Sequence, residues 1–333
     1  MSYSQHFLLS NGLPIPAVGF GTWHIPEEAA EAAVRDAIQT GYRLVDTAAV
    51  YRNEAGTGRG ILSSGVPREE LFITSKLWNT ERSYDKAMRA FDETMERLQL
   101  SYLDLYLIHW PANGREYEDW DAVNRETWRA MIDLYKSGRV RSIGVSNFRP
   151  HHLTSLLESE VPPMVNQIKY HPGFMQQDVV TFCQDNGIVV EAWSPLGHGE
   201  SLQEPVLQQI AARHGCTAAQ AALRWCCQHG VLALPKSVHP ERMAANLQFD
   251  GFALTDAEMA AIDALDIQSW EVTNLPEGAE KTGSANVSYS GTDATITTYD
   301  DPSVVTVTAM GQDITLAVPD SAQSYLPFLS YLG

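Results

Sequence analysis

Eight short apolar runs alternate with longer segments of helical periodicity between Ala17 and about Leu234. The runs are rich in Val, Ile and Leu, and they lie at 17–21, 42–47, 71–77, 103–110, 141–147, 164–168, 188–194 and 231–237. Strands this apolar are typical of a parallel sheet that helices bury on both faces. Eight such strand and helix units predict an α/β fold of the closed (β/α)8 TIM-barrel type. A barrel of this kind needs about 250 residues, which the chain of 333 residues provides.

An open, doubly wound sheet is the main alternative for alternating strands and helices. An open sheet that binds a dinucleotide carries Gly-x-Gly-x-x-Gly directly after its first strand. This chain has Gly19-Phe20-Gly21-Thr22 at that place, which does not match. The closed barrel is therefore the preferred architecture.

Further elements are expected on either side of the barrel. Asn11-Gly12 stands between FLLS and LPIP, a pattern that favours a β-hairpin. After Asp266 the runs NVSYS, DATITTY, SVVTVTA and DITLAVP predict strands, with turns at Gly291 and Gly311. A linker is expected at 276–286 and a short helix at 321–332. We divide the chain into a barrel, 1–269, and a small β-rich C-terminal extension, 270–333, whose role the sequence does not reveal.

The charge balance indicates which partners the protein avoids. With 41 acidic and 23 basic residues, the net charge is −18, which disfavours binding to nucleic acid or to an anionic membrane. Four scattered cysteines indicate neither a disulfide framework nor a metal site. No signal peptide or membrane-spanning run is evident. We expect a cytoplasmic monomer or weak homo-oligomer that acts on a small molecule.

Four polar side chains lie at or just after predicted strand ends. Asp46, Lys76 and His109 end the second, third and fourth strands, and Tyr51 lies in the loop after the second. The carboxyl ends of barrel strands share one rim, where the active sites of such barrels lie. Taken singly, the aspartate suits a helix cap, the lysine a solvated charge and the histidine a buried core group. Their convergence on one rim favours catalysis instead.

These residues also carry a resemblance to a known family. The segment Asp46-Thr-Ala-Ala-Val-Tyr51-Arg-Asn53-Glu54, Lys76 after LFITS, His109 in LIHWP and the run IGVSNF resemble the aldo-keto reductase superfamily. The similarity covers roughly 6–266 and is greatest to the short bacterial branch that includes the 2,5-diketo-gluconate reductases. It implies an oxidoreductase that reduces aldehydes or ketones with a nicotinamide cofactor and without a metal.

Physical chemistry gives each of the four residues a role in such a reaction. A carbonyl that accepts hydride becomes an alkoxide, so the site must supply a proton and stabilise negative charge on oxygen. Tyr51 is the expected proton donor, and the Lys76 ammonium is expected to lower its pKa. Asp46 can keep Lys76 charged and oriented. His109 can hydrogen-bond the carbonyl oxygen and fix the substrate.

The resemblance further implies a set of cofactor-binding positions. Lys236, Ser237 and Arg242 stand where the family binds the adenosine 2′-phosphate, and cations near a helix N-terminus suit a phosphate. The cofactor is therefore expected to be NADPH. The other implied positions are Ser146, Asn147 and Gln167 at the nicotinamide carboxamide, Trp193 stacking on its ring, Ser194, Leu196 and Gly197 near the pyrophosphate, and Gly21, Thr22 and Asn246. The chain departs from the family pattern at Ala245, usually a glutamate, and at Lys169, often acidic.

Aromatic residues after the strand ends predict the substrate pocket. Trp23, Trp78 and Trp110 would form its walls, with Tyr117 and Trp120 added by the loop after the fourth strand. The resemblance implies that residues 267–285 fold over this pocket.

Two other functions are compatible with part of the sequence pattern. A cofactor-binding regulatory subunit could use the acidic extension as an interaction module, but the complete set of four polar residues argues against it. A metal-dependent barrel hydrolase needs several histidine and carboxylate ligands at strand ends, where only His109 is available.

Overall fold

The computed structural model describes residues 5–266, 270–289, 292–319 and 323 of the chain. Eight parallel strands form one sheet in the order β3 to β10. Their bounds are β3 (Phe20–Gly21), β4 (Leu44–Asp46), β5 (Phe72–Leu77), β6 (Leu105–Ile108), β7 (Ile143–Ser146), β8 (Val165–Lys169), β9 (Val189–Trp193) and β10 (Val231–Leu234). All eight predicted strands are present.

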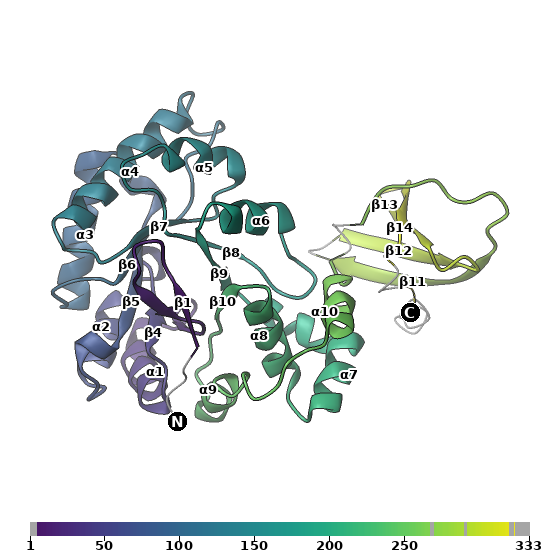
Figure 1. Cartoon of the computed structure of the whole chain (residues 1–333), viewed down its shortest axis with the longest axis horizontal. Coiled ribbons are helices and arrows are strands. Elements are labelled where there is room, and N and C mark those ends of the chain that lie inside the picture. The colour runs from purple at the N-terminus through teal and green to yellow at the C-terminus, as the bar shows by residue number, and fades with distance from the viewer. Residues whose placement is uncertain (1–4, 267–269, 290–291, 320–322, 324–333) are drawn as a thin grey trace.

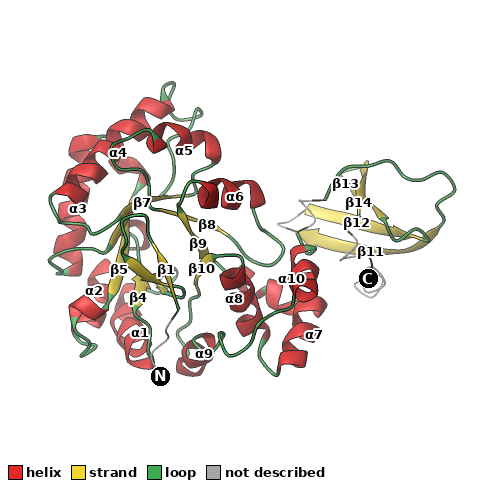
Figure 2. Ribbon diagram, viewed as in Figure 1, coloured by secondary structure: helices red, strands yellow, loops and turns green. Residues whose placement is uncertain are grey.

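The sheet closes on itself between its first and last strands. Val18 forms a parallel bridge with Ala233, and the Gly19 N–H donates to the Ala233 carbonyl at 2.9 Å. This pairing joins β3 to β10, and helices surround the resulting strand cylinder (Figure 2). The predicted closed barrel is confirmed.

The helices follow the strands as the sequence pattern predicts. They are α1 (Glu27–Thr40), α2 (Glu54–Leu62), α3 (Tyr84–Leu98), α4 (Trp120–Lys136), α5 (Pro150–Leu157), α6 (Gln177–Asp185), α7 (Pro205–His214), α8 (Ala218–Gln228), α9 (Pro240–Asn246) and α10 (Asp256–Asp263). Helix α1 buries the stripe that includes Ala30 and Val34. It ends at Gly41, whose φ of 129° favours glycine over other residues.

The predicted hairpin precedes the barrel. Strands β1 (His6–Leu8) and β2 (Pro14–Pro16) pair antiparallel, and Gly12 in their connection has a φ of 83°. Leu9 and Ile15 are buried in the main core. The Asn11 amide donates to the Arg141 carbonyl, which precedes β7, so the hairpin covers the amino-terminal end of the strands.

The C-terminal extension is a four-stranded antiparallel sheet. Strands β11 (Lys281–Tyr289), β12 (Thr292–Tyr299), β13 (Val304–Ala309) and β14 (Gln312–Ala317) pair in sequence order. The predicted turn at Gly311 is confirmed by its φ of 75°. The predicted linker at 276–286 is wrong in its second half, because residues from Lys281 onward are already paired in β11. The turn at Gly291 and the helix at 321–332 fall outside the described residues, apart from Gln323.

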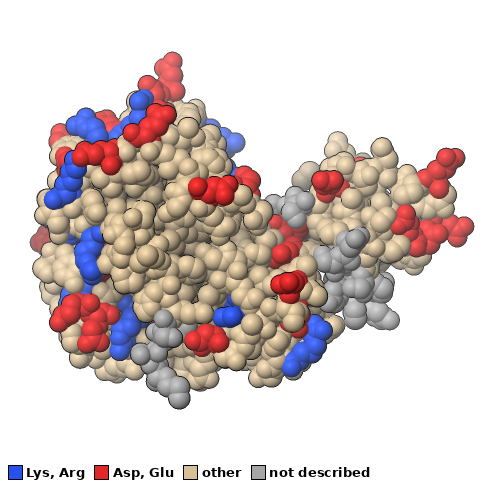
Figure 3. All heavy atoms as spheres, viewed as in Figure 1, with Lys and Arg blue, Asp and Glu red and all other residues tan. Residues whose placement is uncertain are grey.

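The extension stands beside α10 rather than over the barrel rim (Figure 1). Trp270 and Ala264 share a small core with Ile296, Val305 and Leu316, separate from the barrel core. The Thr273 N–H donates to the Thr315 carbonyl, so the chain after α10 pairs with the edge of β14. The charged side chains seen on the extension in this view are acidic (Figure 3). Among the helices described, none has the length and apolarity to cross a membrane.

Candidate active site

A cavity of about 1020 Å³ opens at the carboxyl ends of the barrel strands. Its lining comes mainly from strand ends and the loops after them, so side chains far apart in sequence meet there. Asp46, Tyr51 and His109 line this cavity. The structure therefore brings the side chains predicted at the strand ends together on one rim.

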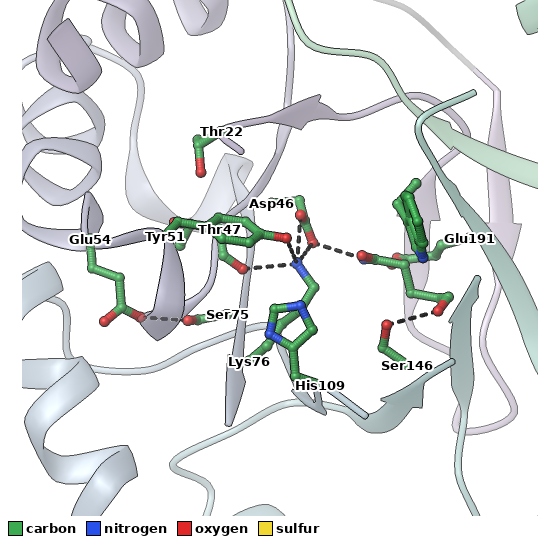
Figure 4. A network of polar contacts seen from close by, with 12 residues as sticks. Thr22, Asp46, Thr47, Tyr51, Glu54, Ser75, Lys76, His109, Ser146 and Glu191 are labelled. Carbon is green, nitrogen blue, oxygen red and sulfur yellow. Dashed lines mark hydrogen bonds and ion pairs between the residues drawn. The ribbon is translucent and has the colours of Figure 1, made fainter. Parts of the chain in front are cut away.

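The Lys76 ammonium is the centre of a buried polar network (Figure 4). Its Nζ lies 2.8 Å and 2.7 Å from the two Asp46 carboxylate oxygens and 3.0 Å from the Thr47 carbonyl. The Tyr51 hydroxyl lies 3.4 Å from the same nitrogen. Lys76 is fully buried, whereas Tyr51 faces the cavity. Tyr51 therefore connects the cavity to the ion pair of Lys76 and Asp46, which is almost completely buried.

The environment sets the charge of the lysine and the tyrosine. Burial lowers the pKa of Lys76, but Asp46 and Tyr51 together outweigh burial and leave that pKa raised, so the ammonium persists. The prediction that Lys76 lowers the pKa of Tyr51 holds for that interaction alone. Burial is the larger effect, and the net pKa of Tyr51 is raised. Tyr51 therefore holds its proton at neutral pH, which a proton donor requires.

His109 is a neutral histidine beside this pair. Burial and then the Lys76 charge lower its pKa to about 2. Its ring packs edge-on against Tyr51 and Trp78, with centroids 5.7 Å and 5.2 Å away. A neutral imidazole can donate one hydrogen bond without adding charge to the cavity.

Asn147 links His109 to Trp193, another residue of the cavity lining. Its amide nitrogen donates to the His109 carbonyl at 3.1 Å and to Ser146 Oγ at 3.0 Å. Its oxygen accepts the Trp193 indole N–H at 2.9 Å. The φ of Asn147 is 62°, an unusual value for a residue with a side chain, and backbone strain of this kind collects at functional sites. These contacts fix the Trp193 ring at the cavity edge.

The segment after β10 adds basic residues to the cavity lining. Lys236, Ser237, Arg242 and Asn246 all line it, and Ser237 and Asn246 are buried. Lys236 and Arg242 are exposed, and neither forms an ion pair within the described part of the chain. Two uncommitted cations and a hydroxyl in the lining of one cavity suit an anionic group such as a phosphate.

The other predicted positions divide into two groups. Gly21, Ser146, Gln167, Ser194 and Leu196 line the cavity, as do the three tryptophans Trp23, Trp78 and Trp110. Thr22 and Gly197 are not in the lining. The Thr22 hydroxyl is buried without a partner among the described residues, and a Cβ on Gly197 would lie 2.0 Å from Ser201 Oγ.

Two predictions about the pocket walls are wrong. Tyr117 and Trp120 do not line the cavity: Arg82 lies over the Tyr117 ring, and Trp120 packs edge-on against His151 and His152. The described part of 267–285 does not line it either, because that segment is drawn into the extension by pairing with β14.

The structure shows where the two departures from the family pattern, Lys169 and Ala245, lie. Lys169 Nζ lies 4.9 Å from the centre of the Phe174 ring, a cation–π contact. Ala245 lines the cavity beside Asn246.

Sequence reasoning missed His198 and Glu191. His198 lines the cavity and contacts Ser194 Oγ at 3.3 Å. Glu191 is a fully buried acid in the middle of the apolar run of β9, a signal that the sequence offered.

Comparisons with known proteins identify the family of the chain. The family model described as "Aldo/keto reductase family" matches residues 17–267. Glyoxal reductase of Bacillus subtilis is 49% identical over 260 residues, covering 77% of this chain and 91% of that protein. Morphine 6-dehydrogenase of Pseudomonas putida is 46% identical over 272 residues, covering 78% and 90%. The crystal structure of an aldo-keto reductase of Bombyx mori in complex with NADP has a TM-score of 0.74 and 36% identity, covering 80% and 94%. The chain belongs to the aldo/keto reductase family of oxidoreductases.

Proposed function

We propose that the protein reduces aldehydes or ketones to alcohols with NADPH, and that Tyr51 is the general acid. The observation that carries the proposal is the Tyr51 hydroxyl, which faces the cavity 3.4 Å from the buried Lys76 ammonium. A protonated phenol beside a permanent positive charge is suited to deliver a proton and then to remain as a stabilised anion.

The chain's residues fit a nicotinamide cofactor. Bound NADPH would supply a hydride to the carbonyl carbon. Trp193, Asn147 and Gln167 would hold the nicotinamide end in the cavity. Lys236, Ser237 and Arg242 would hold a phosphate at the other end, which supports NADPH over NADH. The Bombyx mori relative with NADP supports the same choice.

Proton transfer completes the reaction. As the carbonyl carbon gains hydride, its oxygen gains negative charge and takes the proton from Tyr51. Lys76 stabilises the resulting phenolate, and Asp46 holds Lys76 in place. Neutral His109 would hydrogen-bond the substrate oxygen and orient it toward Tyr51. Tyr51, Lys76 and His109 each act in the protonation state that their surroundings impose.

The walls of the cavity favour small or aromatic carbonyl compounds. Trp78 packs against His109, and Trp23 lies 6.4 Å from Trp193, measured between ring centroids. Trp23 and Trp110 are 41% and 42% exposed, so the entrance is apolar and open to ligands. The similarity to a protein named glyoxal reductase makes a small dicarbonyl a sensible member of the test panel.

We further propose that the division between barrel and extension falls at residues 269 and 270. Within the described residues, the extension packs around a small core to which the barrel adds Ala264 alone, and it supplies nothing to the cavity lining. On this division, every described residue that lines the cavity belongs to the barrel.

The test measures NADPH oxidation by the full chain with a panel of aldehydes, ketones and dicarbonyls. Turnover that is lost in Tyr51→Phe, with NADPH binding retained, is the expected result. Binding of NADPH without turnover of any carbonyl would contradict the proposal and favour a regulatory subunit. Preference for NADH would contradict the assignment of the basic residues.

A further inference from the structure

A second buried acid lies next to the catalytic network. Glu191 on β9 is fully buried, and it pairs in register with Gln167 on β8. Its Oε2 accepts a hydrogen bond from Gln167 Nε2 at 2.7 Å. The same nitrogen donates to Asp46 Oδ1 at 2.9 Å. Glu191 is thus joined through Gln167 to the Asp46 carboxylate that holds Lys76.

These two contacts orient the Gln167 amide. A primary amide has two N–H donors, and the two carboxyl oxygens use both of them. The Gln167 oxygen then points away from both acids, and within the described residues no donor contacts it. Gln167 lines the cavity, so this oxygen is an acceptor available to a ligand. With Asp46 alone, the amide would be held at one point and could rotate.

Burial of Glu191 destabilises the barrel core, and this cost points to a functional role for the residue. Burial and the neighbouring Asp46 charge raise the pKa of Glu191 to about 8, so the group is predominantly neutral at pH 7. Its Oε1 is buried without a partner among the described residues. An apolar side chain of similar size would avoid this cost, because buried polar groups without full hydrogen bonding destabilise a core.

We propose that Glu191 is a positioning residue that aims the Gln167 oxygen at the carboxamide of the nicotinamide and so sets which face of the ring meets the substrate. The inference rests on the proposed function. A carboxamide N–H matches the free acceptor on Gln167. Holding that group fixes the rotation of the ring, and the rotation selects which of the two C4 hydrogens is transferred.

The test compares Glu191→Leu with Glu191→Gln in the full-length protein. Glu191→Gln keeps an acceptor oxygen for Gln167, whereas Glu191→Leu removes it. Loss of one hydrogen bond that positions a ligand corresponds to roughly a 3- to 10-fold effect. We expect Glu191→Leu to weaken NADPH binding by about this factor. Tryptophan fluorescence measures the binding. Transfer from the wrong face of NADPH deuterated at C4 should rise by a similar factor. Glu191→Gln should restore both to near wild-type values.

Two controls separate positioning from folding. Glu191→Leu should melt near the wild-type temperature, since the loss of one Gln167 hydrogen bond is offset by removal of a buried acid with an unpaired oxygen. Adding Glu191→Leu to Gln167→Leu should cause no further loss of transfer fidelity, because Glu191 acts through Gln167.

The outcomes distinguish this inference from the proposed function. Unchanged fidelity and affinity in a folded Glu191→Leu would overturn the role of Glu191 while leaving the reductase intact. An additive loss in the double variant, or failure of Glu191→Gln to rescue, would overturn it as well. A wild-type protein that does not oxidise NADPH with any carbonyl would instead refute the proposed function.

Discussion

Replacing Lys76 by methionine should damage both stability and turnover, and the structure allows the two effects to be separated. Methionine keeps much of the volume of the lysine side chain but removes its charge. Asp46 would then remain as a buried carboxylate with Gln167 as its hydrogen-bond donor. Both partners are almost completely inaccessible, with side-chain exposures of 0% and 6%, so solvent cannot compensate.

The expected magnitude follows from that burial. Removing one partner of a buried ion pair costs about 3–5 kcal/mol, because the other charge is left uncompensated. Turnover should fall by about 10²- to 10⁴-fold, since Tyr51 loses the charge that stabilises its phenolate. A second change, Asp46→Asn, removes the stranded carboxylate. The double variant should therefore recover most of the unfolding free energy and little of the turnover.

The assay pairs guanidinium unfolding with NADPH oxidation in the wild type, the single variant and the double variant. A single variant as stable as the wild type would show that the pair does not hold the barrel together. Recovery of turnover together with stability in the double variant would refute the chemical role of Lys76.

Four further outcomes are expected. Tyr51→Phe should lower turnover by about 10²- to 10⁴-fold with NADPH affinity unchanged in a fluorescence titration; more than half of wild-type activity would remove Tyr51 from the mechanism. Arg242→Ala should weaken NADPH by roughly 10- to 100-fold and NADH hardly at all; equal losses for both would show that Arg242 does not read the phosphate. Glu191 keeps its proton up to about pH 8 when folded, whereas the unfolded chain releases it near 4.3. The unfolding free energy should therefore fall by roughly 1–2 kcal/mol between pH 6.5 and 8. His109, which stays neutral in the folded protein, makes the unfolding free energy rise with pH, but mainly below about pH 6.5, where the unfolded histidine is protonated. This fall should flatten in Glu191→Gln, and an unchanged pH profile there would contradict it. Truncation after Asp266 should leave the KM for carbonyls within twofold, because the described part of the extension does not line the cavity; a large rise would contradict this.

Much of the site was predictable because local sequence patterns show where each strand begins and ends. Apolar runs of strand length specify parallel strands, and parallel strands bring their carboxyl ends to one rim. Asp46, Lys76 and His109 lie within one residue of the carboxyl ends of the consecutive strands β4, β5 and β6, so their meeting follows from the order of the runs alone. The basic residues after β10 reach the same cavity for the same reason.

Loop conformations were less predictable, because they depend on packing against distant segments. Trp120 follows a strand end as Trp110 does, yet it begins α4 and packs on histidines of α5 instead of entering the cavity. The chain after α10 was expected at the rim, but β14 offered an edge for it to pair with. Such pairings join residues more than forty positions apart, which local patterns do not encode.

Charge states were decided only by the tertiary structure. The sequence places Lys76 near Tyr51 and so predicts a lowered tyrosine pKa, but burial depends on everything packed around the group and it outweighs the lysine. Glu191 shows the same limit, since an acid within an apolar strand becomes a neutral neighbour of Gln167 only once the barrel closes around it. Sequence periodicity therefore determined which side chains reach the rim. Desolvation and the exact partners, both products of the closed barrel, determined what those side chains can do.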